Sequence, residues 1–320
     1  MSRSSSSSPE IESPRFGRYR YAGLVIESDV LLPELLPAEM GSAIDLSVHA
    51  CAVLPQAPEL RDVGGGWAVG ETTIRFQVPN VGGFLIHTGR NDAPGRIDVA
   101  PVPGARPSDI RLFLLGSAIG AFLHQRGPLP LHAAGLETQH GCVAIAADSG
   151  AGKSTLAAFL RQRGLRSLCD DVLAVEPRTA LAWPGYPHAK LWGDAARVLG
   201  IDTEGCERVD LGRDKYRVPL AVPAQFRATP QFMTRLYVLA EASGPPRFEP
   251  LFGAAALAEI TRNAYRPFLI GALGRTVRHF EDIVALSSRV RVFRLVRPRG
   301  FDQMARVVDT LTAHVADANP

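Results

Sequence analysis

The chain has 320 residues, of which 46% are hydrophobic and 21% are charged, and this composition excludes a disordered or collagen-like protein. Its 35 basic and 32 acidic side chains leave a formal charge of +3, which is too small to predict a nucleic-acid partner from bulk electrostatics. No apolar run reaches the roughly 18 residues that a membrane-spanning helix needs, so we expect a soluble protein without a membrane partner.

The first residues differ in composition from the rest of the chain. Five consecutive serines lie at positions 4–8, and the first 14 residues contain no apolar segment of the kind found in secretory signals. We therefore interpret residues 1–16 as a disordered tail and expect the protein to be cytoplasmic.

Residues 17–105 are predicted to form a small, mostly β N-terminal domain. Short runs rich in Val, Ile, Phe and Tyr are separated by turn residues such as Gly64-Gly65-Gly66. One run, Thr72–Val78, alternates polar and apolar residues with the period of two that a half-buried strand shows. The predicted strands, mostly antiparallel, are Tyr19–Glu27, Ile44–Cys51, Thr72–Val78, Phe84–Thr88 and Arg96–Val99.

Residues 106–320 are predicted to form a larger α/β domain. A linker, Pro101–Pro107, leads to Ser108, which we interpret as the N-cap of a helix that ends near Gln125 and is buried on more than one face. Strands and helices then alternate, which favours a sheet with some parallel strand pairs. The predicted strands are Leu129–Leu136, Gly141–Ala147, Arg166–Val175, Arg235–Ala240 and Val290–Val296, and the predicted helices are Lys153–Arg163, Leu251–Asn263, Phe268–Arg278 and Phe301–Val315.

The strongest functional signal is a glycine-rich loop between a predicted strand and a predicted helix. Residues Ala147–Thr155 read ADSGAGKST, the pattern of a phosphate-binding P-loop, or Walker A motif. In such a loop the backbone N–H groups and the helix N-terminus surround phosphate oxygens, the lysine reaches the β- and γ-phosphates, and the hydroxyl helps to hold Mg²⁺. We therefore predict that ATP and Mg²⁺ are bound by Asp148, Ser149, Gly150, Ala151, Gly152, Lys153, Ser154 and Thr155.

The loop departs from the P-loop pattern at its first position. Ala147 stands where the pattern has glycine. Because alanine does not easily adopt a positive φ, we expect the loop entrance to use a conformation that alanine tolerates.

Two adjacent carboxylates, Asp170 and Asp171, follow the loop lysine by seventeen and eighteen residues. Neighbouring residues of a strand point to opposite faces, so one carboxylate can face a metal ion while the other faces an acceptor. His132 precedes the loop on the neighbouring predicted strand, flanked by small residues that leave room for a phosphate or another ligand.

Further basic residues lie beyond these motifs. Three of them follow turn-rich segments: Lys190, Lys215 and Arg217. Two interpretations are open for each: it binds a phosphate group or an acidic peptide, or it is an ordinary surface charge. Arg262 and Arg266 are four residues apart, and on one helix they would share a face.

His132, the loop Asp148–Thr155 and the pair Asp170-Asp171 together resemble the catalytic domain of bacterial HPr kinase/phosphorylases. The segments Tyr21–Leu36 and Pro184–Trp192 further resemble stand-alone HPr-kinase-like proteins, some of which phosphorylate a serine of lasso-peptide precursors. This resemblance implies an α/β P-loop kinase core that is shared with phosphoenolpyruvate carboxykinases. It also implies an ATP-dependent serine kinase whose partner is a peptide or protein carrying that serine.

The resemblance also implies roles for individual residues. Asp170 would act as the base on the acceptor serine, with Lys153 and His132 as the other catalytic residues, and Ser154 and Asp171 would lie on the metal side. The chain lacks the C-terminal signature of the HPr enzymes, so HPr itself is not implied as the substrate. Whether the protein forms a homo-oligomer is left open by the sequence.

Two alternatives use the same loop. A regulatory module would bind the nucleotide without transferring phosphate, although a pure switch would not need the Asp170-Asp171 pair. Transfer of a nucleotidyl group instead of phosphate also stays open. An ABC-type ATPase is disfavoured because the chain has no LSGGQ-like signature.

Overall fold

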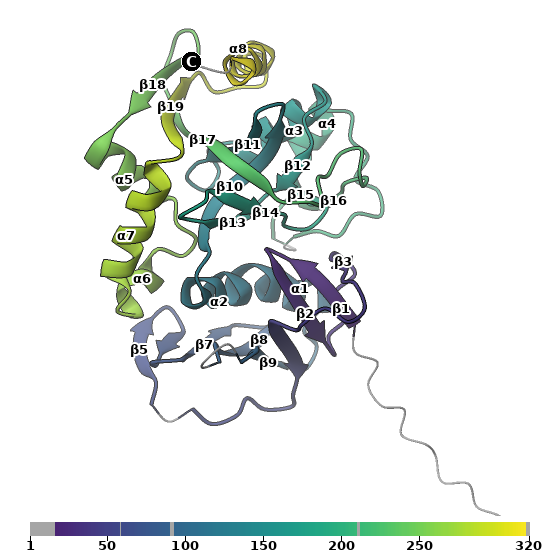
Figure 1. The fold of residues 1–320 in the computed structure, drawn as a ribbon. Coiled ribbons are helices and arrows are strands. Elements are labelled where there is room, and N and C mark those ends of the chain that lie inside the picture. Colours follow the sequence, from purple (N-terminus) through teal and green to yellow (C-terminus); the bar gives the residue numbers. More distant parts are fainter. Residues whose placement is uncertain (1–16, 58, 90–92, 210–211, 318–320) are drawn as a thin grey trace, which may run out of the picture.

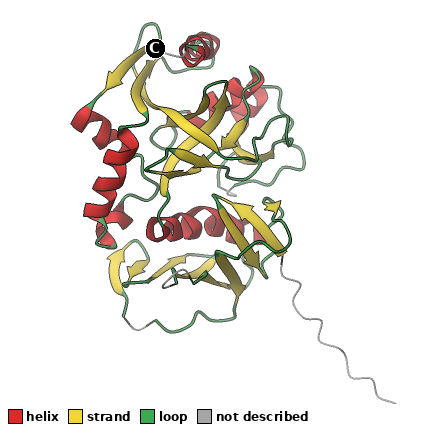
Figure 2. Ribbon diagram, in the orientation of Figure 1, coloured by secondary structure: helices red, strands yellow, loops and turns green. Residues whose placement is uncertain are grey.

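The computed structural model describes residues 17–57, 59–89, 93–209 and 212–317, and the predicted tail at 1–16 lies outside this range. The architecture is mixed α/β, with one nine-stranded, one eight-stranded and one two-stranded sheet. Helices α1 (Pro107–Phe113) and α2 (Ile119–Arg126) lie between the two large sheets (Figure 1). Most of the other helices gather around the eight-stranded sheet, as the colouring by secondary structure shows (Figure 2).

The nine-stranded sheet is built entirely from residues 17–101. Its pairs are antiparallel except where β4 lies parallel to both β2 and β9. The predicted strand Tyr19–Glu27 is in fact two strands, because Ala22 and Gly23 have φ values of 55° and 81° and turn the chain back on itself. The strands are β1 Gly17–Tyr21, β2 Leu24–Ser28, β3 Leu36–Pro37, β4 Leu46–Ala50, β5 Arg61–Gly64, β6 Trp67–Val69, β7 Thr73–Val78, β8 Gly82–His87 and β9 Gly95–Pro101.

The helix after this sheet starts earlier than the sequence predicts. Its N-cap is Arg106, and Pro107 occupies the first helical position, where a fixed φ and a missing N–H are tolerated. The predicted N-cap at Ser108 is therefore wrong. A π-helical segment, η1 (Leu114–Ala118), joins α1 to α2. The predicted burial on more than one face is confirmed, because every residue from 114 to 123 is buried.

The eight-stranded sheet carries the glycine-rich loop. Strand β11 lies parallel to β17, which lies parallel to β19, whereas β10 is antiparallel to β11 and β13, so the expected partial parallel pairing is confirmed. The predicted strand Arg166–Val175 is interrupted at Asp170-Asp171. The strands are β10 Leu129–Thr138, β11 Gly141–Ala146, β12 Ser167–Cys169, β13 Val172–Glu176, β14 Leu181–Trp183, β17 Gln231–Glu241, β18 Arg247–Leu251 and β19 Arg291–Arg297.

Strand β11 is buried on both faces, which explains why its sequence is a continuous apolar run. Cys142, Ala144 and Ala146 join the core beneath α5 (Gly253–Arg262) and α7 (Thr276–Ser287). Val143 and Ile145 join the core beneath α3 (Lys153–Gln162) and α8 (Met304–Ala316). The loop after β11 is therefore fixed by two packed layers of helices.

The remaining elements complete the surroundings of the loop. They are α4 Gly193–Val198, α6 Phe268–Ala272 and the two-stranded sheet of β15 His188–Trp192 and β16 Lys215–Pro219. The predicted helix Phe268–Arg278 is interrupted because Gly274 has a φ of 65°, and α7 was not predicted as a separate helix. None of the helices in the described ranges combines the length and apolarity needed to cross a bilayer.

Candidate functional site

The loop between β11 and α3 has the backbone geometry that its glycines allow. Gly150 and Gly152 have φ values of 85° and 90°, in the left-handed region that side chains other than glycine rarely adopt. Ala147 is not among the residues with positive φ, as expected at the loop entrance. A Cβ on Gly152 would lie 2.8 Å from Nη2 of Arg297, so a larger residue here would also displace this guanidinium group.

The loop opens onto the N-terminus of α3. The first backbone N–H groups of a helix lack acceptors within it and carry the positive end of the helix dipole. Asp148, Ser149 and Gly150 are exposed, so an anion can approach these groups from solvent. The Lys153 side chain is buried and its Nζ donates to the backbone oxygen of Asp170 at 2.6 Å, which brings the lysine tip to the carboxylate pair.

Asp170 lies directly beside the loop. Its Oδ2 accepts hydrogen bonds from the Ser154 hydroxyl at 3.2 Å and from the Lys190 backbone N–H at 3.0 Å. Its Oδ1 is buried and has no hydrogen-bond partner among the described residues. A buried carboxylate oxygen without a partner, next to a serine hydroxyl, provides the hard oxygen ligands that Mg²⁺ prefers.

Asp171 points to a different set of side chains. Its Oδ1 lies 3.2 Å from Nε2 of His132, and its Oδ2 accepts a hydrogen bond from Nζ of Lys190 at 2.7 Å. Burial alone would raise the pKa of Asp171, but the charge of Lys190 and the hydrogen bond from His132 outweigh it and hold that pKa well below its usual range. Conversely, Asp171 raises the pKa of Lys190 despite burial of the ammonium group.

The two carboxylates differ in how accessible they are. Asp170 is only 6% exposed, whereas the side chains of Asp171 and His132 keep 23% and 32% of their surface in solvent. An external molecule can therefore reach the Asp171–His132 pair more easily than Asp170.

Strand β10 brings these side chains together. It pairs with β11 through Ala133 and Ala146, so His132 lies beside the point where the loop begins. On its other edge it pairs with β13 through His132 and Val172, and this fixes Asp171 next to His132. The break between β12 and β13 is thus aligned with the start of the loop.

Two residues of this cluster were not assigned a role from the sequence. Lys190 lies on β15, and the sequence left open whether it binds a ligand or is a surface charge. In the structure its backbone N–H donates to Asp170 and its Nζ donates to Asp171. Tyr265 packs its ring edge-on against His132, with the ring centres 6.0 Å apart. No motif marks Tyr265, which follows α5 in the sequence and reaches the site because its backbone N–H bonds to Pro130 at 2.7 Å.

Other predicted candidates lie apart from this cluster. Arg217 is buried in ion pairs with Glu34 and Glu207, which leaves it a structural role. Arg262 ends α5 and Arg266 has a φ of 53°, so the two arginines do not share a helix face.

Asp148 lies at the exposed part of the loop, whereas Lys215 lies within the electrostatic field of the carboxylates: burial lowers its pKa, and the charges of Asp170 and Asp171 oppose this shift. Asp148 is 74% exposed and its nearest basic partner is Arg262, at 3.7 Å. The Lys215 ammonium lies over the ring of Trp192, 5.5 Å from the ring centre.

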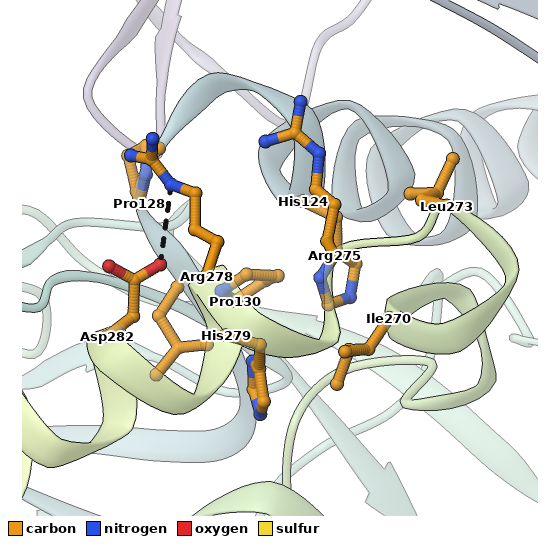
Figure 3. Close-up of a pocket in the computed structure, with 11 residues that line it drawn as sticks. His124, Pro128, Pro130, Ile270, Leu273, Arg275, Arg278, His279 and Asp282 are labelled. Atoms are coloured by element: carbon orange, nitrogen blue, oxygen red, sulfur yellow. Dashed lines mark ion pairs between the residues drawn. The ribbon is translucent and has the colours of Figure 1, made fainter. Parts of the chain in front are cut away.

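A small basic pocket of about 20 Å³ is lined by residues of α2, α6 and α7 and of the segments that flank them (Figure 3). His124 and His279 line it together with Arg275, Arg278 and Asp282. His124 donates from Nε2 to the backbone oxygen of Tyr265 at 2.5 Å. This hydrogen bond helps to hold Tyr265, whose ring packs against His132. Burial, with the nearby positive groups, lowers the pKa of His124 to about 4, although the Tyr265 hydrogen bond opposes this shift.

This histidine predicts a loss of stability in acid. In the unfolded chain the pKa of His124 is near 6.5, whereas in the folded chain it is about 4. The free energy of unfolding should therefore fall as the pH is lowered from about 6.5 to about 4. The contribution is at most about 3 kcal/mol. His279, whose pKa burial also lowers, acts in the same direction.

Urea unfolding at pH values above and below the window measures this effect. The variant His124→Gln keeps a donor for Tyr265 but does not titrate, so its stability should depend less on pH. Equal pH dependence in the two proteins would contradict the assignment.

Comparisons with known proteins find similarity to solved structures and not to sequence families. No protein-family model matches the chain, and no curated protein sequence matches it. The solved structure of the Hpr(Ser) kinase/phosphatase from Coxiella burnetii is similar at 15% sequence identity and a TM-score of 0.29, covering 58% of this chain and 96% of that one. At this level of similarity the chemistry has to be inferred from the residues of this chain.

Proposed function

We propose that this protein is an ATP-dependent kinase, a transferase that moves the γ-phosphoryl group to a serine hydroxyl of a peptide or protein. The observation that carries the proposal is the continuous set of contacts from Lys153 and Ser154 through Asp170 to Asp171 and His132. A nucleotide switch needs only the loop. Phosphoryl transfer additionally needs an acceptor positioned close to the lysine tip, and the carboxylate pair supports this.

Ser154 and Asp170 are the residues that would hold Mg²⁺. Their oxygens are 3.2 Å apart, and the second oxygen of Asp170 is buried with no partner in the described part of the chain. When bound, the ion would neutralise charge on the β- and γ-phosphates. The resemblance assigned Asp171 to the metal side, but the contact of Ser154 with Asp170 favours exchanging the two roles.

Asp171 is then the group proposed to act on the acceptor. Its low pKa keeps it ionised at neutral pH, and Lys190 and His132 fix the direction of its two oxygens. The acceptor oxygen would form a bond to the γ-phosphorus while the bond from that phosphorus to the ADP oxygen breaks. The hydroxyl proton would pass to Asp171, as it does to a kinase aspartate.

A serine of a ribosomally made precursor peptide, of the lasso type, is the acceptor to test first. This choice rests on the resemblance of the segments Tyr21–Leu36 and Pro184–Trp192 to stand-alone HPr-kinase-like proteins. A cytoplasmic location would suit such a substrate.

Mass spectrometry of candidate peptides after incubation with the protein, ATP and Mg²⁺ tests the proposal. We expect the serine peptide to gain the mass of one phosphoryl group, with an equal amount of ADP, and the same peptide with serine replaced by alanine to remain unmodified. Release of pyrophosphate with a nucleotidylated product would contradict phosphoryl transfer. ATP binding without any modified peptide would favour a regulatory module.

A further inference from the structure

A cavity of about 350 Å³ opens beside the glycine-rich loop, and neither Asp170 nor Asp171 lines it. The loop forms one wall through residues 150–152 and Thr155, and the segment 297–304 after β19 forms another. Trp192 and Asp194, at the junction of β15 and α4, complete the lining. Cavities that hold small molecules or cofactors typically start at about 300 Å³, so the space suits a nucleoside.

The apolar part of this cavity is aromatic and accessible. Trp192 and Phe301 are 37% and 36% exposed, whereas Met304 beside them is 4% exposed. Lys215 lies over the Trp192 ring, 5.5 Å from its centre, and restricts the position of that ring. Partly exposed aromatic rings around a cavity are suited to stacking against a nucleobase.

The polar part of the cavity is tied to the loop. Arg297 is 6% exposed; its Nη2 donates to the backbone oxygen of Ala151 at 2.6 Å and its Nη1 to that of Pro298 at 3.2 Å. Its Nε is buried without a hydrogen-bond partner among the described residues. Arg297 therefore fixes the loop and keeps a positive charge where the cavity meets the phosphate-binding backbone.

Asp194 supplies a hydrogen-bond acceptor to the lining of the cavity. Its Oδ1 accepts the Ala195 backbone N–H at 2.7 Å, which orients the carboxylate. A carboxylate in this position can accept hydrogen bonds from the hydroxyl groups of a ribose.

We propose that this cavity binds the purine nucleoside of the triphosphate, with the base against Trp192 and Phe301 and the ribose toward Asp194. The inference rests on the proposed function, because the triphosphate must be held by the loop. A purine fits better than a pyrimidine because its larger ring system covers more of the two aromatic side chains.

Calorimetric titration of the full-length protein with ATP, CTP and inorganic tripolyphosphate, each with Mg²⁺, tests this proposal. We expect ATP to bind more tightly than tripolyphosphate and CTP to lie between them. Trp192→Leu should weaken ATP binding by roughly 10-fold to 100-fold, as loss of one stacking contact predicts, and leave tripolyphosphate unchanged. ATP should also change the tryptophan fluorescence of the wild-type protein.

Phe301→Ala provides a second variant in case Trp192→Leu fails to fold, and should also weaken ATP but not tripolyphosphate. Phe252→Ala is a matched control, because this phenylalanine is 76% exposed and does not line the cavity. Equal affinity for ATP and tripolyphosphate, or an unchanged ATP affinity in both cavity variants, would overturn the inference but leave the proposed function. Failure of the wild-type protein to bind tripolyphosphate and ATP would overturn both.

Discussion

Asp171→Asn is expected to lower the rate of phosphoryl transfer by roughly 10²–10⁴-fold, the range that a general base contributes. Asparagine has nearly the same shape as aspartate but cannot take up the proton of the serine hydroxyl. Nucleotide affinity should change little, because Ser154 contacts Asp170 and not Asp171. Transfer to the serine peptide and ATP affinity, measured on the same preparation, separate the two effects.

The substitution also affects the fold, and a paired variant controls for this. Asparagine leaves the Lys190 ammonium, 2.7 Å from Asp171, without its counter-ion. Removing one partner of a fully buried ion pair costs about 3–5 kcal/mol, whereas replacing both partners by apolar groups is often neutral. The Asp171–Lys190 pair is only partly buried, with 23% and 12% of the side chains exposed, so the cost here should be smaller. Asp171→Leu combined with Lys190→Met should therefore regain stability but not activity.

Asp170→Asn distinguishes the proposed roles from the roles that the resemblance implies. If Asp170 holds Mg²⁺, this variant should lose the Mg²⁺-dependent part of ATP affinity. Intact Mg²⁺-dependent binding in Asp170→Asn, together with full transfer by Asp171→Asn, would show that Asp170 is the acceptor base and that our assignment is wrong.

The difference between these two assignments shows where sequence reasoning ends. The loop is a local motif, so its strand, its helix and the conformation at Ala147 follow from adjacent residues. The alternation rule indicates that Asp170 and Asp171 point in different directions, but not which one faces Ser154. That choice depends on the register of β13 with β10, which pairs residues forty positions apart, Val172 and His132.

The remaining site residues depend on contacts that are still more distant in sequence. Lys190 lies on β15, which pairs with β16 more than twenty residues further along the chain, and no local pattern predicts that this strand contacts the aspartates. Tyr265 packs on His132 because Gly120 of α2 leaves room for its ring: a Cβ there would lie 2.6 Å from it. Residue preferences also do not predict a positive φ at a residue other than glycine, such as Ala22.

Lys153→Met is expected to lower both ATP affinity and phosphoryl transfer, the latter by at least roughly 10²–10³-fold, as for loss of one preorganised charge-stabilising donor. Methionine keeps the apolar stem of the buried side chain, so the packing around α3 should persist. The ammonium that it removes lies 2.6 Å from the Asp170 backbone oxygen, between the loop and the carboxylates.

Arg163→Met provides the matched control for this charge, because Arg163 lies at the other end of α3 and is 51% exposed in a pair with Asp309. It removes one positive charge near the same helix without touching the loop. ATP affinity and transfer should be unchanged in this control, and tripolyphosphate binding should be lost only in Lys153→Met. If Lys153→Met and Arg163→Met bind tripolyphosphate with equal affinity, Lys153 does not hold the phosphates. Its ammonium group would then contribute no more to binding than the distant positive charge of Arg163.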